Sequence, residues 1–137
     1  MSMVLDIPVG SIGTTTVMVG EEHTAPRIGS GKIHVLATPV MINLFEAAAL
    51  AACEHLLPAG HQSLGTHLDV SHIAATPIGM RATATAEVIG VEGRTIKFRL
   101  QARDERDIIG EGLHERVVVN VAKFDLRVQE KVALIKR

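Results

Sequence analysis

The chain has 137 residues, 14 lysines and arginines against 15 aspartates and glutamates, and a formal net charge of −1. This length suits one domain with one core, so we expect residues 1–137 to form a single domain. Hydrophobic residues make up 47% of the chain, which excludes disorder as its main state. The balanced charge and the lack of Trp and Tyr disfavour nucleic-acid binding, which needs a basic surface and stacking rings.

The sequence gives no sign of export or of membrane insertion. Cys53 is the only cysteine, so the chain cannot form an internal disulfide. Residues 1–10 lack the basic start and apolar run of a signal peptide. No stretch approaches the roughly 18 apolar residues that span a bilayer. We therefore expect a cytoplasmic protein without a membrane partner.

The first half of the chain predicts one strand and one long helix. β-branched residues at 14–19 lie between two glycines and indicate a strand, whereas residues 21–31 contain Pro and Gly and indicate irregular structure. Thr38 and Pro39 predict a helix start, with Thr38 as the N-cap and Pro39 in the first helical position. The helix is expected over 40–57, with an apolar face made of Met41, Phe45, Ala48, Ala49 and Ala52. Its many alanines suggest that another element packs very close to it.

The second half predicts four long strands followed by an amphipathic tail. Each strand segment has alternating or β-branched residues, and turn signals separate them; the segments are 64–74, 80–91, 94–103 and 112–121. Glu92 and Gly93 predict a tight hairpin. Residues 124–137 are expected to be a strand end followed by a helix.

This order of elements favours an α+β fold. A parallel sheet would need several crossover helices, and only one strong helix is present. We therefore predict a curved antiparallel sheet wrapped around one long central helix. One sheet on one helix leaves its outer face and edge strands uncovered, so we expect a homodimer.

Three polar residues are the candidates for chemistry: Thr38, Glu46 and His72. Glu46 lies eight positions after Thr38 in an otherwise apolar helix, where an ionised carboxylate needs a partner or a pocket. His72 alternates with Val70 and Ala74, so it should face the helix. A hydroxyl, a carboxylate and an imidazole in an apolar cleft suit hydrolysis of an activated acyl compound. Free N–H groups at the helix start could stabilise an oxyanion.

Two segments carry a resemblance to a known family: ATPVMINLFEAAALAACEHLL at 37–57 and SLGTHLDVSHIAATPIG at 63–79. From about residue 17 to 123 the sequence resembles the fluoroacetyl-CoA thioesterase-like branch of the hotdog-fold acyl-CoA thioesterases. The Thr–Glu spacing of 46 − 38 = 8 and the Glu–His spacing of 72 − 46 = 26 fit that family's catalytic trio.

The resemblance implies a hotdog fold, a homodimer with sites at the subunit interface, and an acyl-CoA substrate. It implies that Thr38, Glu46 and His72 are the catalytic set. It also implies that Gly65 lies close to the thioester and that Arg116 lies near the CoA. No metal and no separate cofactor are expected, because coenzyme A is part of the substrate.

The segment before the helix departs from the family pattern. Fluoroacetyl-CoA-specialised members close the acyl pocket with aromatic side chains there, and residues 21–37 contain no aromatic residue. We therefore expect a short- to medium-chain or branched acyl-CoA substrate, without strong preference for fluoroacetyl-CoA over acetyl-CoA.

Each candidate residue also has a purely structural interpretation. Thr38 could be a simple helix cap, Glu46 a carboxylate paired across a dimer, and His72 a hydrogen-bonded core histidine. The fold could instead carry an enoyl-CoA hydratase or dehydratase, or a non-catalytic acyl-CoA binding module.

Two further features favour structural roles. Cys53 follows Glu46 by seven residues and is expected to be a small buried filler. His67 and Asp69 share a strand face, but two ligands without a third do not define a metal site.

Overall fold

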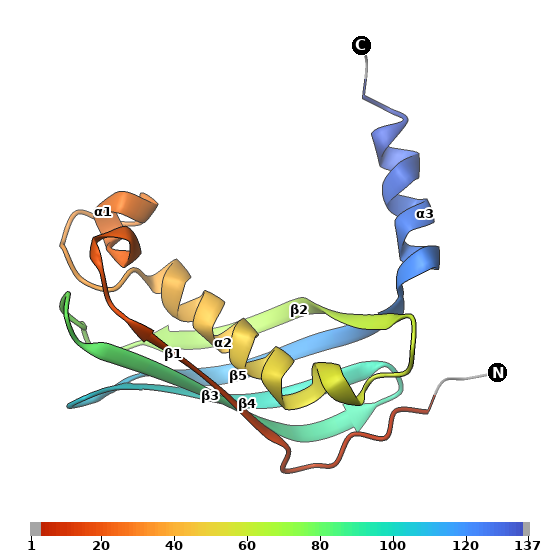
Figure 1. The fold of residues 1–137 in the computed structure, drawn as a ribbon, viewed down its shortest axis with the longest axis horizontal. Helices are drawn as coiled ribbons and strands as arrows, with labels where there is room; N and C mark the ends of the chain where they lie inside the picture. The colour runs from red at the N-terminus through yellow and green to blue at the C-terminus, as the bar shows by residue number, and fades with distance from the viewer. Residues whose placement is uncertain (1–3, 136–137) are drawn as a thin grey trace.

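A five-stranded antiparallel sheet curls around one long helix in the computed structural model, which describes residues 4–135 (Figure 1). The sheet order is β1-β3-β4-β5-β2. In chain order the elements are β1 (Ile12–Met18), a 3₁₀ turn (Glu21–His23), α1 (Ala25–Ile28), α2 (Thr38–Cys53), a second 3₁₀ turn (Glu54–Leu56), β2 (His61–His72), β3 (Arg81–Glu92), β4 (Thr95–Asp104), β5 (Ile108–Asn120) and α3 (Val121–Val132). The α+β prediction is confirmed.

The helix α2 lies across the concave side of the sheet, closest to β1 and β3, and forms the core with apolar side chains that come mainly from β3 and β4. The residues of its predicted apolar face are all fully buried; they are Met41, Phe45, Ala48, Ala49 and Ala52. Gly13 of β1 is so close to α2 that a Cβ there would collide with the helix backbone. The alanines of α2 therefore allow a strand to pack directly against the helix, as their number suggested.

The start of α2 differs from the prediction. Ala37 is the N-cap, Thr38 is the first helical residue and Pro39 the second, and no side chain caps the helix. Thr38 does not cap because its hydroxyl hydrogen-bonds to the distant residue His72 instead. The expectation that Thr38 is the helix cap was wrong.

The strands extend beyond several predicted boundaries, but their number and order agree with the prediction. β2 begins at His61 and β5 at Ile108, three and four residues earlier than expected. The hairpin between β3 and β4 turns at Gly93, whose φ of +60° favours glycine.

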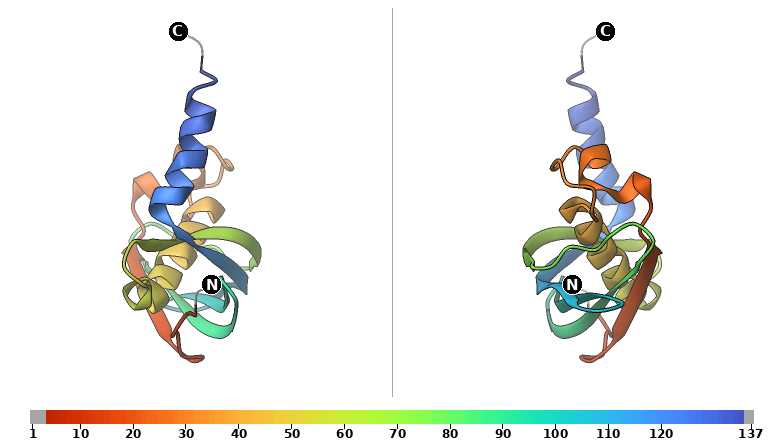
Figure 2. Two further views of the ribbon diagram at one scale, coloured as in Figure 1. Left: turned by 90° about the vertical axis from the view of Figure 1, so that its right-hand side faces the viewer. Right: turned by 90° about the vertical axis from the view of Figure 1, so that its left-hand side faces the viewer.

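The helix α3 leaves the end of β5 and projects away from the sheet (Figures 1 and 2). The Asn120 side chain caps it by accepting a hydrogen bond of 3.0 Å from the Lys123 N–H. The helix begins at Val121, so the strand end expected at 124 is wrong, and no residue of the helix is buried. Residues 136 and 137 of the expected tail lie outside the described residues. No helix within residues 4–135 is long and apolar enough to cross a membrane.

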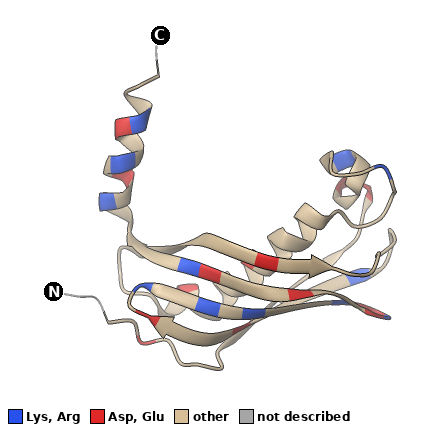
Figure 3. Ribbon diagram, turned by 180° about the vertical axis from the view of Figure 1, so that it is seen from behind, with Lys and Arg blue, Asp and Glu red and all other residues tan. Residues whose placement is uncertain are grey.

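β2 and β1 are the two edges of the sheet. β2 is twelve residues long, and the side chains of Leu64 and Leu68 are 38% and 37% exposed along it. The convex face of the sheet carries charges of both signs (Figure 3). On it Lys97 pairs with Glu92 at 3.2 Å.

Candidate active site

The first candidate pair joins the start of α2 to the end of β2. Thr38 Oγ1 and His72 Nδ1 share a hydrogen bond of 2.7 Å. Burial lowers the pKa of His72 below its ordinary value, so the neutral ring is favoured at pH 7. His72 Nε2 is buried and has no hydrogen-bond partner among the described residues. A buried ring nitrogen without a partner is costly in a resting protein and available to a bound molecule.

A pocket of about 400 Å³ opens beside this pair. Thr38 and His72 line it together with parts of the segment 25–36 before the helix and of the segment 73–75 after β2. The lining contains no Phe, Tyr or Trp side chain. The pocket therefore lies directly beside the threonine–histidine pair, and no large ring narrows it.

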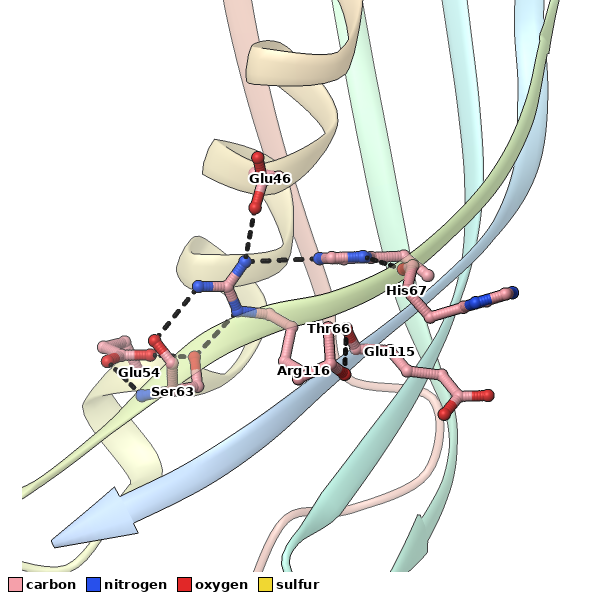
Figure 4. A network of polar contacts seen from close by, with 8 residues as sticks. Glu46, Glu54, Ser63, Thr66, His67, Glu115 and Arg116 are labelled. Atoms are coloured by element: carbon pink, nitrogen blue, oxygen red, sulfur yellow. Dashed lines mark hydrogen bonds and ion pairs between the residues drawn. The ribbon is translucent and has the colours of Figure 1, made fainter. Parts of the chain in front are cut away.

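The second candidate group surrounds Glu46, in the middle of α2 (Figure 4). Arg116 Nη1 donates a hydrogen bond of 3.3 Å to Glu46 Oε2. The Arg116 side chain is 6% exposed, whereas that of Glu46 is 38% exposed. A buried guanidinium thus holds one oxygen of a carboxylate that solvent can still reach.

Gly65 completes this second group. It pairs with Arg116 across the β2–β5 ladder, next to an irregularity in β2 between residues 65 and 67. A Cβ at Gly65 would lie 2.5 Å from Glu46 Oε2 and 3.2 Å from His114 Cε1. Only glycine therefore leaves the Glu46 carboxylate in its observed place.

Sequence reasoning missed three residues that contact this group: Ser63, Glu54 and His114. Ser63 accepts from Arg116 Nε at 2.8 Å, and Glu54 accepts from the Ser63 hydroxyl at 2.8 Å. His114 Nε2 lies 3.2 Å from Arg116 Nη1. One signal was present: His114 and Arg116 alternate with outward residues on β5, which places two polar side chains on the inner face.

Arg116, which the resemblance places near the CoA, has a buried guanidinium bonded to Glu46, Ser63 and His114. Its proximity to the CoA stays a prediction. Its direct contact with Glu46 makes it part of the carboxylate's environment.

Within one chain the five predicted site residues form two groups. Thr38 pairs with His72, whereas Glu46, Gly65 and Arg116 contact one another. Thr38 and Glu46 are eight residues apart on α2, which corresponds to about 12 Å along the helix axis. Both groups include residues of α2 and β2, and the second group also includes Arg116 of β5.

The structure also describes the residues expected to have structural roles. Burial raises the pKa of the Cys53 thiol to about 11, which disfavours the reactive thiolate. His67 and Asp69 are both exposed. Within residues 4–135 no group of three or more His, Cys, Asp or Glu side chains is arranged to hold a metal ion.

The enclosed helix, the curled antiparallel sheet and the paired polar groups define a hotdog-fold thioesterase, and comparisons with known proteins agree. Residues 19–122 match the family model described as fluoroacetyl-CoA-specific thioesterase. A fluoroacetyl-CoA thioesterase of Streptantibioticus cattleyicolor is 45% identical over 97 residues, which cover 71% of this chain and 70% of the relative. The chain belongs to the fluoroacetyl-CoA-specific thioesterase family.

Solved structures show the same relationship. The fluoroacetyl-CoA thioesterase FlK is 37% identical with a TM-score of 0.86, and the match covers 91% of this chain and 97% of FlK. A Thermus thermophilus protein of the thioesterase superfamily is 28% identical with a TM-score of 0.85, covering 94% and 98%. These likenesses confirm the predicted family and fold.

Proposed function

We propose that the protein is an acyl-CoA thioesterase that hydrolyses a short- to medium-chain acyl-CoA to a free acid and CoA. Its family membership supports the thioester hydrolysis. The observation that carries the proposal is the Glu46 carboxylate, half-exposed and held by the buried Arg116, on the helix that begins at the Thr38–His72 pair.

Glu46 is the proposed centre of the reaction. As a general base it takes a proton from water while the water oxygen attacks the thioester carbonyl carbon. Collapse of the tetrahedral intermediate breaks the C–S bond, and the departing thiolate takes up a proton. As a nucleophile Glu46 would instead form a mixed anhydride, which water then hydrolyses. In both routes the ionised carboxylate is required.

Thr38 and His72 are proposed to act on the substrate from the pocket side. If the Thr38 hydroxyl donates to His72 Nδ1, the ring proton is on Nε2, the buried atom without a described partner. That N–H is then available to a thioester oxygen or to the leaving sulfur. The neutral ring favoured by burial has one nitrogen that donates and one that accepts.

The pocket lining supports the proposed substrate range. A cavity of about 400 Å³ without Phe, Tyr or Trp in its walls has room for more than a two-carbon acyl group. A variant of the relative FlK has been solved in complex with acetyl-CoA, and another in complex with fluoroacetate. Each added methylene in an apolar pocket is worth about 1–3 kcal/mol, so rates should change gradually with chain length.

We also propose that the protein is a homodimer. β2 is an edge strand of twelve residues with two half-exposed leucines, Leu64 and Leu68, and a second copy could pair along it. Size-exclusion chromatography with light scattering is expected to give twice the chain mass of 14.7 kDa. A monomer mass at micromolar concentration would contradict the dimer. We propose a cytoplasmic location because a charged CoA ester cannot cross a bilayer unaided.

A thiol-release assay over a panel of acyl-CoA esters tests the proposed activity. We expect turnover that varies gradually with chain length, with no strong preference for fluoroacetyl-CoA over acetyl-CoA. A kcat/KM for fluoroacetyl-CoA thousands of times that for acetyl-CoA would contradict the substrate range. Enoyl-CoA consumption without thiol release would favour a hydratase, and ligand-induced stabilisation without turnover a binding module.

A further inference from the structure

The buried guanidinium of Arg116 is held mainly by groups other than Glu46 (Figure 4). Arg116 Nε donates to Ser63 Oγ at 2.8 Å, and Nη2 donates to the Ser63 carbonyl at 3.1 Å. Nη1 lies 3.2 Å from His114 Nε2 and donates to Glu46 Oε2 at 3.3 Å. Since the guanidinium is a rigid plane, contacts to Ser63 and His114 fix where its Nη1 meets Glu46.

Glu54 determines how Ser63 is oriented. The carboxylate accepts from the Ser63 hydroxyl at 2.8 Å and from the Ser63 backbone N–H at 3.0 Å. An ionised carboxylate only accepts, so the hydroxyl proton must point to Glu54. The lone pairs of Ser63 Oγ are then free to receive the Arg116 Nε–H.

His114 is held in one protonation state and one tautomer. A guanidinium has no acceptor, so His114 Nε2 must accept from Arg116 and cannot carry a proton. The Nδ1–H then donates to the His67 carbonyl at 2.8 Å. Burial lowers the pKa of His114, and the ring stacks on Phe98 at a centroid distance of 5.7 Å. The acceptor that faces Arg116 is therefore fixed in place.

We propose that Ser63 and His114 are positioning residues that aim Arg116 at Glu46, and that Glu54 acts in the same way through Ser63. This inference rests on the proposed role of Glu46 as the reacting carboxylate. The three residues act only through the guanidinium: they fix one Glu46 oxygen on Arg116 Nη1 and leave the other oxygen for water or the thioester. A displacement of about 1 Å at a reacting group can cost on the order of 10²-fold in rate.

Paired substitutions separate positioning from packing. Ser63→Ala and His114→Leu remove the side-chain contacts to Arg116, although the Ser63 backbone carbonyl still accepts from Nη2. Ser63→Thr keeps the hydroxyl, and His114→Gln keeps an acceptor. We expect kcat to fall by about tenfold or more in the first two variants with KM little changed, and to be largely retained in the second two. Glu54→Ala should behave like Ser63→Ala, and Glu54→Gln should be milder because it still accepts a hydrogen bond.

Ser11→Ala is the matched control for stability. The Ser11 hydroxyl donates a hydrogen bond of 2.7 Å to the carbonyl of Ala52. Ala52 is on α2, as Glu46 is, but lies six residues further along the helix. The control should lower the melting temperature, by less than Ser63→Ala because it loses one hydrogen bond to a neutral carbonyl and not two to charged groups, while leaving kcat unchanged. If His114→Leu does not fold, Ser63→Ala and His114→Gln decide the question.

A double-variant cycle tests whether the residues act through Arg116. Arg116→Lys keeps the positive charge but loses the guanidinium, whose Nε and Nη2 both donate to Ser63. Ser63→Ala is expected to lower kcat much less in this variant than in the wild-type protein. Equal effects in both backgrounds, or wild-type kcat in Ser63→Ala and His114→Leu, would overturn the inference. If Glu46→Gln also retained full turnover, the proposed function itself would be wrong.

Discussion

The hydroxyl of Thr38 and the imidazole of His72 share a hydrogen bond of 2.7 Å although 34 residues separate them in the chain. This bond ties the first turn of α2 to the last residue of β2. It removes Thr38 from the capping role that its sequence position favours, and it leaves His72 Nε2 facing no protein partner in the described structure. The helix α2 therefore has no side-chain cap, and a hydrogen-bonded threonine–histidine pair lines the pocket.

The first prediction concerns this pair. Thr38→Val and His72→Phe should each lower kcat while retaining the fold, and Thr38→Ser should restore much of the activity. Because the two residues act as a unit, the double variant should be little worse than the poorer single variant. The loss of stability in Thr38→Val should be about 0.5–1.5 kcal/mol, the worth of one hydrogen bond. Steady-state kinetics and urea unfolding measure both effects, and fully multiplicative losses in kcat would contradict the pairing.

The second prediction concerns Gly65. A methyl group there meets Glu46 Oε2 at 2.5 Å, so Gly65→Ala should displace the carboxylate and lower kcat. Gly90→Ala is the matched control, since a Cβ at that strand position meets nothing within 4 Å. Activity assays and melting curves of the two variants should differ in kcat far more than in melting temperature. Equal activities would argue against a close approach of Gly65 to the reacting carboxylate.

The third prediction concerns stability against pH. Burial lowers the pKa of both His72 and His114 below 6.5, so the folded protein binds fewer protons than the unfolded chain in the range just below that value. The free energy of unfolding should therefore be highest above about pH 6.5 and should decrease as the pH falls below that value. Urea titrations at pH 5.5 and 7.5 measure the difference. His114→Gln should reduce that difference; higher stability at pH 5.5 would contradict the burial of these rings.

The fourth prediction concerns Cys53. Its thiol is buried and its pKa is raised to about 11, first by desolvation and then by the neighbouring Glu54. A thiol reagent at pH 8 should therefore titrate no cysteine in the native protein and one per chain after denaturation. Rapid labelling of the native protein would show that the site opens. If Cys53 reacts slowly, it also adds no signal to the thiol-release assay, which then reports only the CoA set free.

The sequence predicted the features that depend on local spacing. The 3–4 spacing of Met41 and Phe45 gave the buried face of α2, and the alanines indicated the close approach that Gly13 makes. The alternation of side chains along the strand correctly predicted that His72 faces the helix, where it hydrogen-bonds to Thr38. The resemblance also implied that these residues act together with Glu46, which stays a prediction because Glu46 lies in a second group within one chain.

Contacts between distant residues could not be predicted in the same way. Thr38 and Pro39 have the sequence pattern of a capped helix start. No local rule shows that the Thr38 hydroxyl forms a hydrogen bond with a histidine 34 residues away. Arg116 reaches Ser63 across 53 residues and Glu46 across 70. Such contacts depend on the register of β2 against β5, which the alternation of side chains leaves open by steps of two residues.

The central claim is that the Glu46 carboxylate carries the hydrolysis, and Glu46→Gln tests it most directly. Glutamine keeps the size and a hydrogen-bond acceptor for Arg116 but removes the basic carboxylate. Thiol release on the best substrate of the panel should fall by about 10²–10⁴-fold, with a melting temperature close to that of the wild type. A folded Glu46→Gln protein with near-normal turnover would contradict the claim.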